Sequence, residues 1–191
     1  MKILKLASSC VLSGMLLLNG CATSAPAKVS QLLDAPYATD SENQKSDDLA
    51  LKHKLQDMLD AQLVGNDIRV VVTFSNVLLV GQVVSDKIKD QASAIAKTLP
   101  NVKKVLNYLS INSMPSFNSS SSISNLATER IGLQQDVYAA NLTLITVDGV
   151  IYIMGSNIGS LSALNIAAQS LYSLEKVTKV VNLIQKSTQD Y

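Results

Sequence analysis

Residues 77–82 read VLLVGQ, and residues 151–156 read IYIMGS. Both stretches have four bulky apolar residues, then Gly, then a polar residue, and they lie 74 positions apart. Each follows a strand-like segment across a short polar turn, so each predicts the returning strand of a β-hairpin. The likeness indicates one structural module that is present twice.

The elements around the two stretches repeat in the same order. In the first copy we expect a helix from Ser46, a hairpin, a helix after Ser85 and a strand, over the ranges 46–65, 68–84, 85–99 and 102–111. In the second copy the same elements are expected over 123–133, 141–154, 160–174 and 177–185. Asp148-Gly149 is a typical two-residue hairpin turn. Each copy therefore predicts a small α+β domain with the order α-β-β-α-β.

The last strands of the two copies also agree in sequence. VKKVLNYL at 102–109 matches VTKVVNLI at 177–184 with an offset of 75 residues, and four positions are identical. The offset of the glycines is 74, so one residue is inserted between the glycine and the last strand. Agreement in order, spacing and residue type predicts an internal duplication. Two copies are too few for a solenoid, so each is expected to be a domain.

The N-terminus has the pattern of a secretory signal. Lys2 and Lys5 precede a short apolar segment, which is too short to span a bilayer comfortably. Leu18-Asn19-Gly20-Cys21 resembles the bacterial lipobox, which implies cleavage after residue 20 and acylation of Cys21, with an ordinary signal peptide as the alternative. Under this interpretation Cys10 is removed, so no intramolecular disulfide is expected. Ala22 after the cysteine resembles the sorting signal for the outer membrane.

Two segments lack the periodicity of a packed element. We expect 21–45 to be a lipidated flexible tether, because it carries two Pro, several Ala and Ser, and scattered charges. Residues 112–122 form a Ser/Asn run around Pro115 and are expected to be a linker. The expected domains therefore cover 46–111 and 123–187. Asp47 and Asp48 are expected in the first turn of a helix, where the helix dipole favours acidic residues.

The repeat resembles the BON domain. The resemblance rests on the hairpins that end in VLLVGQ and IYIMGS, the following helices and the V-x-K-V-x-N strands, behind a lipobox. Two such domains in this context resemble the dual-BON outer-membrane lipoproteins. The resemblance implies a three-stranded mixed sheet with two helices on one face of each domain. It also implies a periplasm-facing outer-membrane protein, which binds anionic phospholipid and supports outer-membrane integrity.

Composition gives little support to an enzyme or a nucleic-acid-binding protein. The chain of 191 residues has a formal net charge of +1, so no broad basic field suggests nucleic acid. His53 is the one histidine in the sequence, lies between two lysines and off the apolar stripe, and is interpreted as a solvated side chain. No metal site, cofactor site or catalytic constellation is predicted. Gly81 and Gly155 are interpreted as structural glycines.

The helix expected at 123–133 is where the resemblance implies contact with lipid. Membrane-facing helices combine basic residues with bulky apolar ones, and this helix has one base and no aromatic residue. The sequence therefore departs from the family pattern here. The candidate lipid-binding residues are Ile123, Leu126, Arg130, Leu133 and Tyr138.

The strands of the second domain are apolar on both faces. A sheet with helices on one face alone should alternate with polar residues, which is not the case at 142–147 or 151–154. We therefore expect the second face to be covered by the other domain, a partner or a second copy. Hence two functions stay open: a phospholipid-binding module, or a protein–protein adaptor for envelope assembly proteins that uses this face.

Overall fold

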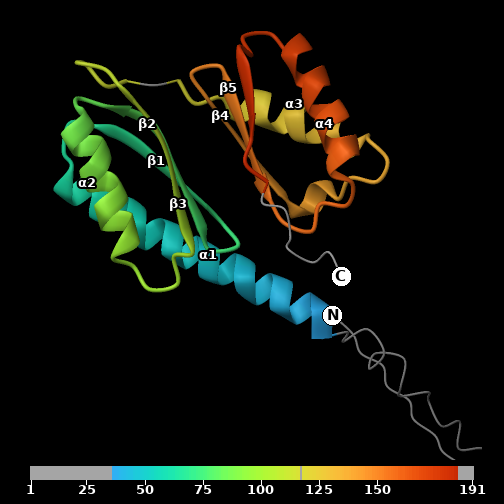
Figure 1. Cartoon of the computed structure of the whole chain (residues 1–191), viewed down its shortest axis with the longest axis horizontal. Helices are drawn as coiled ribbons and strands as arrows, with labels where there is room; N and C mark the ends of the chain where they lie inside the picture. Colours follow the sequence, from blue (N-terminus) through green and yellow to red (C-terminus); the bar gives the residue numbers. More distant parts are fainter. Residues whose placement is uncertain (1–35, 117, 185–191) are drawn as a thin grey trace, which may run out of the picture. The chain divides into compact units, whose positions relative to one another are not determined.

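The protein is described here by a computed structural model, which covers residues 36–116 and 118–184. The expected signal peptide and Cys21 lie outside the described residues. The described residues from Pro36 onward belong to one compact unit. They contain two copies of the same arrangement of helices and strands (Figure 1).

The first copy has the order α-β-β-α-β. Its elements are α1 (Pro36–Gln62), β1 (Asp67–Thr73), β2 (Asn76–Val83), α2 (Asp86–Lys97) and β3 (Lys104–Ile111). β2 is the central strand and pairs antiparallel with β1 and parallel with β3. Both helices cover the same face of this mixed sheet (Figure 1).

The second copy repeats this order with two added 3₁₀ turns. Its elements are α3 (Ser121–Gly132), η1 (Ala139–Asn141), β4 (Leu142–Val147), β5 (Val150–Gly155), α4 (Leu161–Ser170), η2 (Leu171–Ser173) and β6 (Lys179–Asn182). β5 is again central, antiparallel to β4 and parallel to β6. The predicted α+β class and both three-stranded mixed sheets are therefore confirmed.

Strand register shows that the two copies match residue by residue. Val77 lies opposite Val105 in the first sheet, and Ile151 lies opposite Val180 in the second. The sequence comparison matched Val77 with Ile151 at an offset of 74, and Val105 with Val180 at an offset of 75. Residues that are equivalent in the repeat therefore have equivalent strand partners. The inserted residue therefore lies between the central strand and the last strand of the second copy.

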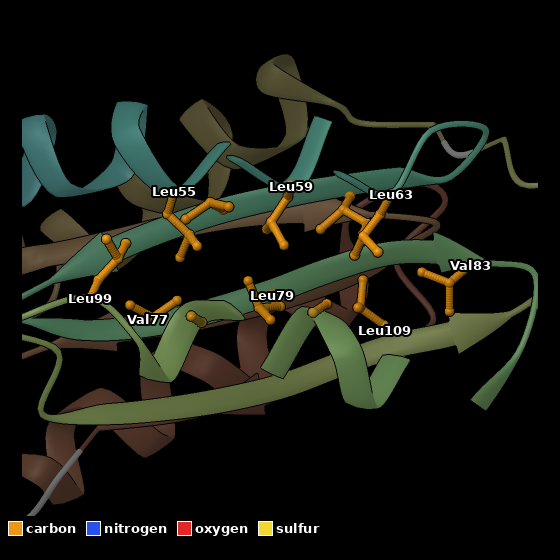
Figure 2. Close-up of a cluster of buried hydrophobic side chains, with 12 residues drawn as sticks. Leu55, Leu59, Leu63, Val77, Leu79, Val83, Leu99 and Leu109 are labelled. Atoms are coloured by element: carbon orange, nitrogen blue, oxygen red, sulfur yellow. The ribbon is translucent and has the colours of Figure 1, made fainter. Parts of the chain in front are cut away.

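The core of the first copy fills the space between its sheet and its helices (Figure 2). α1 contributes an apolar stripe, and β2 contributes alternate residues, because strand side chains point to opposite faces in turn. The residues labelled in Figure 2 are all buried: Leu55, Leu59, Leu63, Val77, Leu79, Val83, Leu99 and Leu109. This core depends on no residue of the second copy.

The second copy has its own core of the same design. Ile151 and Ile153 of β5 lie against α3 and α4, where Ala127, Ile131 and Leu164 are fully buried. Leu55 and Leu59 of the first copy correspond by position to Ala127 and Ile131, 72 residues later. The smaller Ala127 leaves α3 with less buried apolar surface than α1 has.

The other faces of the two sheets pack against each other. A third cluster of buried side chains combines Leu78 and Val80 of β2 with Tyr152 and Met154 of β5, and Val71 and Val147 also belong to it. The rings of Tyr108 and Tyr152 meet edge to face, with centroids 5.4 Å apart. The first copy therefore covers the second face of the sheet that was expected to be covered.

Hydrogen bonds at one edge of this contact hold the linker, residues 112–122, against the two domains. Gln82 follows Gly81 on β2, and its side chain donates to the carboxylate of Asp148 over 2.9 Å. The same Gln82 accepts from Asn112 and Ser116, and the Asp148 carboxylate accepts from the backbone amide of Asn118. The Ser/Asn-rich segment is thus bound to both domains along its described residues.

Two expectations about local structure are wrong. α1 begins at Pro36 rather than near Ser46, so residues 36–45 are helical and do not belong to a flexible tether. Asp48 consequently lies inside the helix, and not in its first turn. The first hairpin turns at Phe74-Ser75, and both residues have a positive φ.

Candidate functional site

Each copy has a cleft at the same place in the fold. It lies between the first helix, the hairpin turn and the connection that leads into the last strand. Leu51, Lys54 and Leu99 line the first cleft, and Ile123, Leu126 and Leu174 stand at the equivalent positions of the second. An exposed apolar side chain, Leu126, therefore lies in the second cleft at the position where the first cleft has Lys54.

The turn beside the first cleft is held by a carboxylate. Phe74 and Ser75 have φ of 51° and 62°, a left-handed conformation that side chains other than glycine adopt at a cost. The buried carboxylate of Asp48 accepts hydrogen bonds from both of their amides, at 2.6 and 2.9 Å. Asp48 therefore has a structural role, which is to stabilise this turn.

The turn beside the second cleft is held differently. Asp148 and Gly149 have φ of 49° and 76°, and the amide of Asp148 donates to the carbonyl of Asn118 over 3.1 Å. The carbonyl of Gly149 accepts from the amide of Thr178 over 2.8 Å. No carboxylate from α3 reaches this turn among the described residues, and Ile123 and Leu126 give the cleft an apolar wall.

The candidate lipid-binding residues of α3 share one side of the helix. Leu126 and Leu133 are seven residues apart, as are Ile123 and Arg130, and seven residues make almost two full turns. Leu126 is 51% exposed and Leu133, the C-cap residue, is 82% exposed. Ile123 is half buried against the core of the second copy. The structure therefore brings these four positions together and exposes two apolar side chains.

Arg130 is held by the other helix of its domain. Its Nη1 donates to the carbonyl of Ser170, 3.0 Å away, and to the hydroxyl of Ser173. These groups lie at the C-terminal end of α4, where carbonyls lack helical partners and a cation is favoured. Arg130 thus joins α3 to α4, a role that the sequence did not suggest.

Tyr138 lies beyond the C-terminus of α3 and is largely exposed. Its amide donates to the carbonyl of Ile158, and Val137 beside it forms an isolated β-bridge with Gly159. Tyr138 is therefore fixed by the backbone of its loop while its ring faces solvent.

Gly81 and Gly155 have different physical reasons to be glycine. Gly81 has a φ of 118°, which strains any residue with a Cβ. Gly155 has no such φ, but a Cβ there would lie 2.5 Å from the carbonyl oxygen of Asn141 and 2.9 Å from Leu142. Matching positions in the repeat thus require glycine through conformation in one copy and through close packing in the other.

Asn107 and Asn182, which are matched in the two last strands, act alike in the structure. The side-chain amide of Asn107 donates to the carbonyl of Lys89 and to Ser93 on α2, and that of Asn182 donates to Asn165 on α4. Each side-chain oxygen also accepts from the backbone amide two residues later. Sequence comparison found the identity but not this role, since it depends on contacts with the helices.

Other functional possibilities receive no support from the described residues. His53 is exposed, and no group of three or more His, Cys, Asp or Glu side chains in the described part could hold a metal ion. None of the described helices is both long enough and apolar enough to cross a bilayer. Cys21, the expected acylation site, lies outside the described residues.

Comparison with known proteins agrees with this geometry. A family model for the BON domain matches residues 47–113, which cover the first copy from α1 to the end of β3. The outer membrane lipoprotein DolP of Haemophilus influenzae is 29% identical over 145 residues, which span 73% of this chain and 74% of that protein. The likeness therefore extends into the second copy.

Solved structures add little to this. Two structures of CdsD, a structural protein of the type III secretion system of Chlamydia trachomatis, cover 70% and 71% of this chain at 12% and 11% identity. They cover 96% and 91% of their own chains, and the TM-score is 0.29 for both, too low to support any argument. The first copy thus matches the BON domain, the second copy repeats its αββαβ order, and the chain is similar to DolP over 73% of its length.

Proposed function

We propose that this protein is a non-catalytic outer-membrane lipoprotein that faces the periplasm and binds anionic phospholipid. In this proposal Cys21 carries the acyl chains that anchor it, and the bound phospholipid helps it to support envelope integrity. The similarity to the outer membrane lipoprotein DolP supports the location, and the lipobox-like Leu18–Cys21 supports the anchor. More than one acyl chain makes such an anchor stable.

The exposed apolar row of α3 is the observation that carries the lipid-binding proposal. Leu126 and Leu133 lie on one side of the helix, and Tyr138 lies beyond its end. Each fully buried leucine gains about 1.5–3 kcal/mol relative to its exposed state, so insertion of these two side chains between lipid headgroups is favourable. α1 has a cation, Lys54, at the position that matches Leu126, so the first domain is less suited to this contact.

Arg130 supplies the charge complementarity in this proposal. Both of its hydrogen bonds to the end of α4 use Nη1, and a guanidinium carries N–H groups on three nitrogens. The remaining donors are available to meet a lipid phosphate beside Leu126 and Leu133. The attachment to Ser170 and Ser173 fixes the position of this cation before lipid binds, which lowers the entropy cost of the contact.

The alternative, an adaptor that uses the apolar sheet face, has lost its main support. That face is buried in the cluster of Leu78, Val80, Tyr152 and Met154 between the two domains. The excess of apolar residues in the second sheet is therefore explained within the chain. No other feature of the described residues favours a protein partner over a lipid surface.

Vesicle binding of residues 22–191 tests the proposal. We expect binding to vesicles with phosphatidylglycerol, little binding to pure phosphatidylcholine, and a large loss of binding in the double variant Leu126→Ser/Leu133→Ser. The matched control is Val64→Ser on the first domain, because Val64 is 82% exposed, as is Leu133. Circular dichroism checks that all variants keep the fold. Equal binding of the double variant and the control, or equal binding to both lipids, would exclude the proposal.

A further inference from the structure

A small hollow lies on the other side of α1 from the first cleft. It is bounded by the helix, by the end of β1 and by the residues that lead into β4, and its volume is about 200 Å³. The side chains that matter for its chemistry are Lys45, Leu49, Lys52, Thr73, Phe74 and Leu142. It shares no residue with the apolar row of α3, so any ligand it takes is additional to the proposed membrane contact.

Thr73 gives this hollow an unused polar group. Its side chain is buried, with 7% exposure, and its hydroxyl has no hydrogen-bond partner among the described residues. A buried hydroxyl without a partner costs about 1–3 kcal/mol. The Thr73 oxygen is covered in the unliganded protein, so a ligand in the hollow reaches it after a rotation of the side chain about χ1. A hydrogen bond from Thr73 to the ligand then offsets this cost.

The charge of the hollow favours an anion. Lys45 and Lys52 are seven residues apart on α1, so both lie on the side of the helix that borders the hollow. The one acid in the lining is Asp48, and its two oxygens already accept from the amides of Phe74 and Ser75. Two cations therefore face the hollow, while the single carboxylate is occupied by the turn.

The remaining lining combines apolar side chains with Gln44, Asn141 and Thr143, and the space is small. Leu49 lies between the two lysines on α1 and is half exposed, and Phe74 and Leu142 form further apolar wall. A volume of about 200 Å³ is below the range of about 300–1,000 Å³ that is typical of pockets for drug-sized ligands. The hollow therefore suits a small ligand rather than a whole phospholipid.

We propose that the hollow between α1 and the start of β4 binds a small amphipathic anion, a carboxylate or a phosphate on a short apolar chain. Lys45 and Lys52 hold the anionic group, Thr73 donates a hydrogen bond to it, and Leu49 and Leu142 contact the chain. The elements that form the hollow come from both domains, so the ligand also stabilises their packing.

Titration of residues 22–191 with sodium hexanoate, followed by NMR of the backbone amides, tests this site. We expect saturable shifts at Lys45–Lys52, Thr73 and Leu142, and a loss of affinity of about tenfold or more in Lys45→Gln/Lys52→Gln. The control is Lys54→Gln, which removes a cation from the same helix on the side of the first cleft. Hexyl phosphate and inorganic phosphate show which anion is preferred, and whether the chain is needed.

Thr73→Val separates a binding role from a structural one. Because the hydroxyl has no partner in the unliganded protein, this variant should leave thermal stability unchanged or higher, while hexanoate affinity falls. The site is disproved if hexanoate gives no saturable shifts, if hexanol binds as tightly as hexanoate, or if the two-lysine variant binds like Lys54→Gln. Loss of stability in Thr73→Val would show that the hydroxyl has a partner in the fold and would remove it from the proposal.

Discussion

The carboxylate of Asp48 accepts a hydrogen bond of 2.9 Å from the amide of Ser75, 27 residues away in sequence. The same carboxylate binds the amide of Phe74, and Gln44 donates to it from the preceding turn of α1. Phe74 and Ser75 are both left-handed, which usually requires glycine or asparagine. Asp48 is thus the residue that makes this glycine-free turn stable.

Replacement of Asp48 should therefore weaken the whole first domain. Asp48→Ala leaves two turn amides without an acceptor, and we expect the free energy of unfolding to fall by about 2–3 kcal/mol. Asp48→Asn keeps one acceptor oxygen and should cost less. Urea denaturation measures both, and Asp47→Ala, an exposed neighbour, should stay within about 0.5 kcal/mol of wild type. Equal effects at Asp47 and Asp48 would contradict this role.

Two glycines of the second domain should respond in opposite ways to alanine. At Gly155 a Cβ would lie 2.5 Å from the backbone oxygen of Asn141, so Gly155→Ala should destabilise by about 1–3 kcal/mol. At Gly132, the last residue of α3, the nearest atom is 3.6 Å away, so Gly132→Ala should stabilise by up to about 1 kcal/mol. Thermal denaturation of the two variants is the measurement, and a shift in the same direction for both would refute the packing argument.

Disruption of the contact between the two sheets should leave each domain folded. Leu78 is fully buried in the interdomain cluster and belongs to neither domain core, so Leu78→Asp should open the contact but leave both cores. ¹⁵N relaxation should then show two rotational correlation times, where wild type shows one. Val84→Asp, at an exposed position after the same strand, is the control. A single correlation time in Leu78→Asp would contradict the prediction, because the two domains would still tumble as one body.

Tyr152 should make stability depend on pH in alkaline solution. Burial, the nearby Tyr108 and the carboxylate of Asp148 raise the pKa of Tyr152 above its usual 10.0. A raised pKa in the folded state means that the folded protein holds this proton more tightly than the unfolded chain does. The stabilisation is therefore complete below pH 10 and is lost as the pH rises through the folded-state pKa.

Comparison of stability across this range tests the effect. We expect wild type to lose stability between about pH 10 and pH 12 more steeply than Tyr152→Phe, which has no proton to lose. Tyr138→Phe, an exposed tyrosine of the same domain, should follow the wild-type curve. If Tyr152→Phe and wild type decline in parallel, the phenol does not contribute.

Most of the fold followed from local pattern. The repeat of VLLVGQ and IYIMGS predicted both central strands, and the strand register confirms it, because Val77 pairs with Val105 as the equivalent Ile151 pairs with Val180. The start of α1 was missed because residues 36–45 have no apolar stripe, which is the signal that periodicity detects. These residues extend a helix that is packed and stable further along the chain.

What the sequence did not reveal depends on contacts between distant residues. The bonds from Asp48 to the turn, from Arg130 to the end of α4 and from Gln82 to Asp148 join residues 26 to 66 positions apart. No rule that is based on spacing in the sequence predicts such pairs. The apolar second face of β4 and β5 was visible in sequence, yet three covers were compatible with it until the packing of the two sheets was seen.

The packing of the two sheets also constrains how this chain can evolve. The two copies carry apolar surfaces that shield each other from water, with Leu78 and Val80 on one and Tyr152 and Met154 on the other. A shortened protein that lacked one domain would expose the apolar sheet surface of the remaining domain to water. Such exposed surfaces promote aggregation. Several polar replacements would be needed at once for a single copy to be soluble. The contact between the two sheets thus disfavours the loss of either domain, independently of what either domain binds.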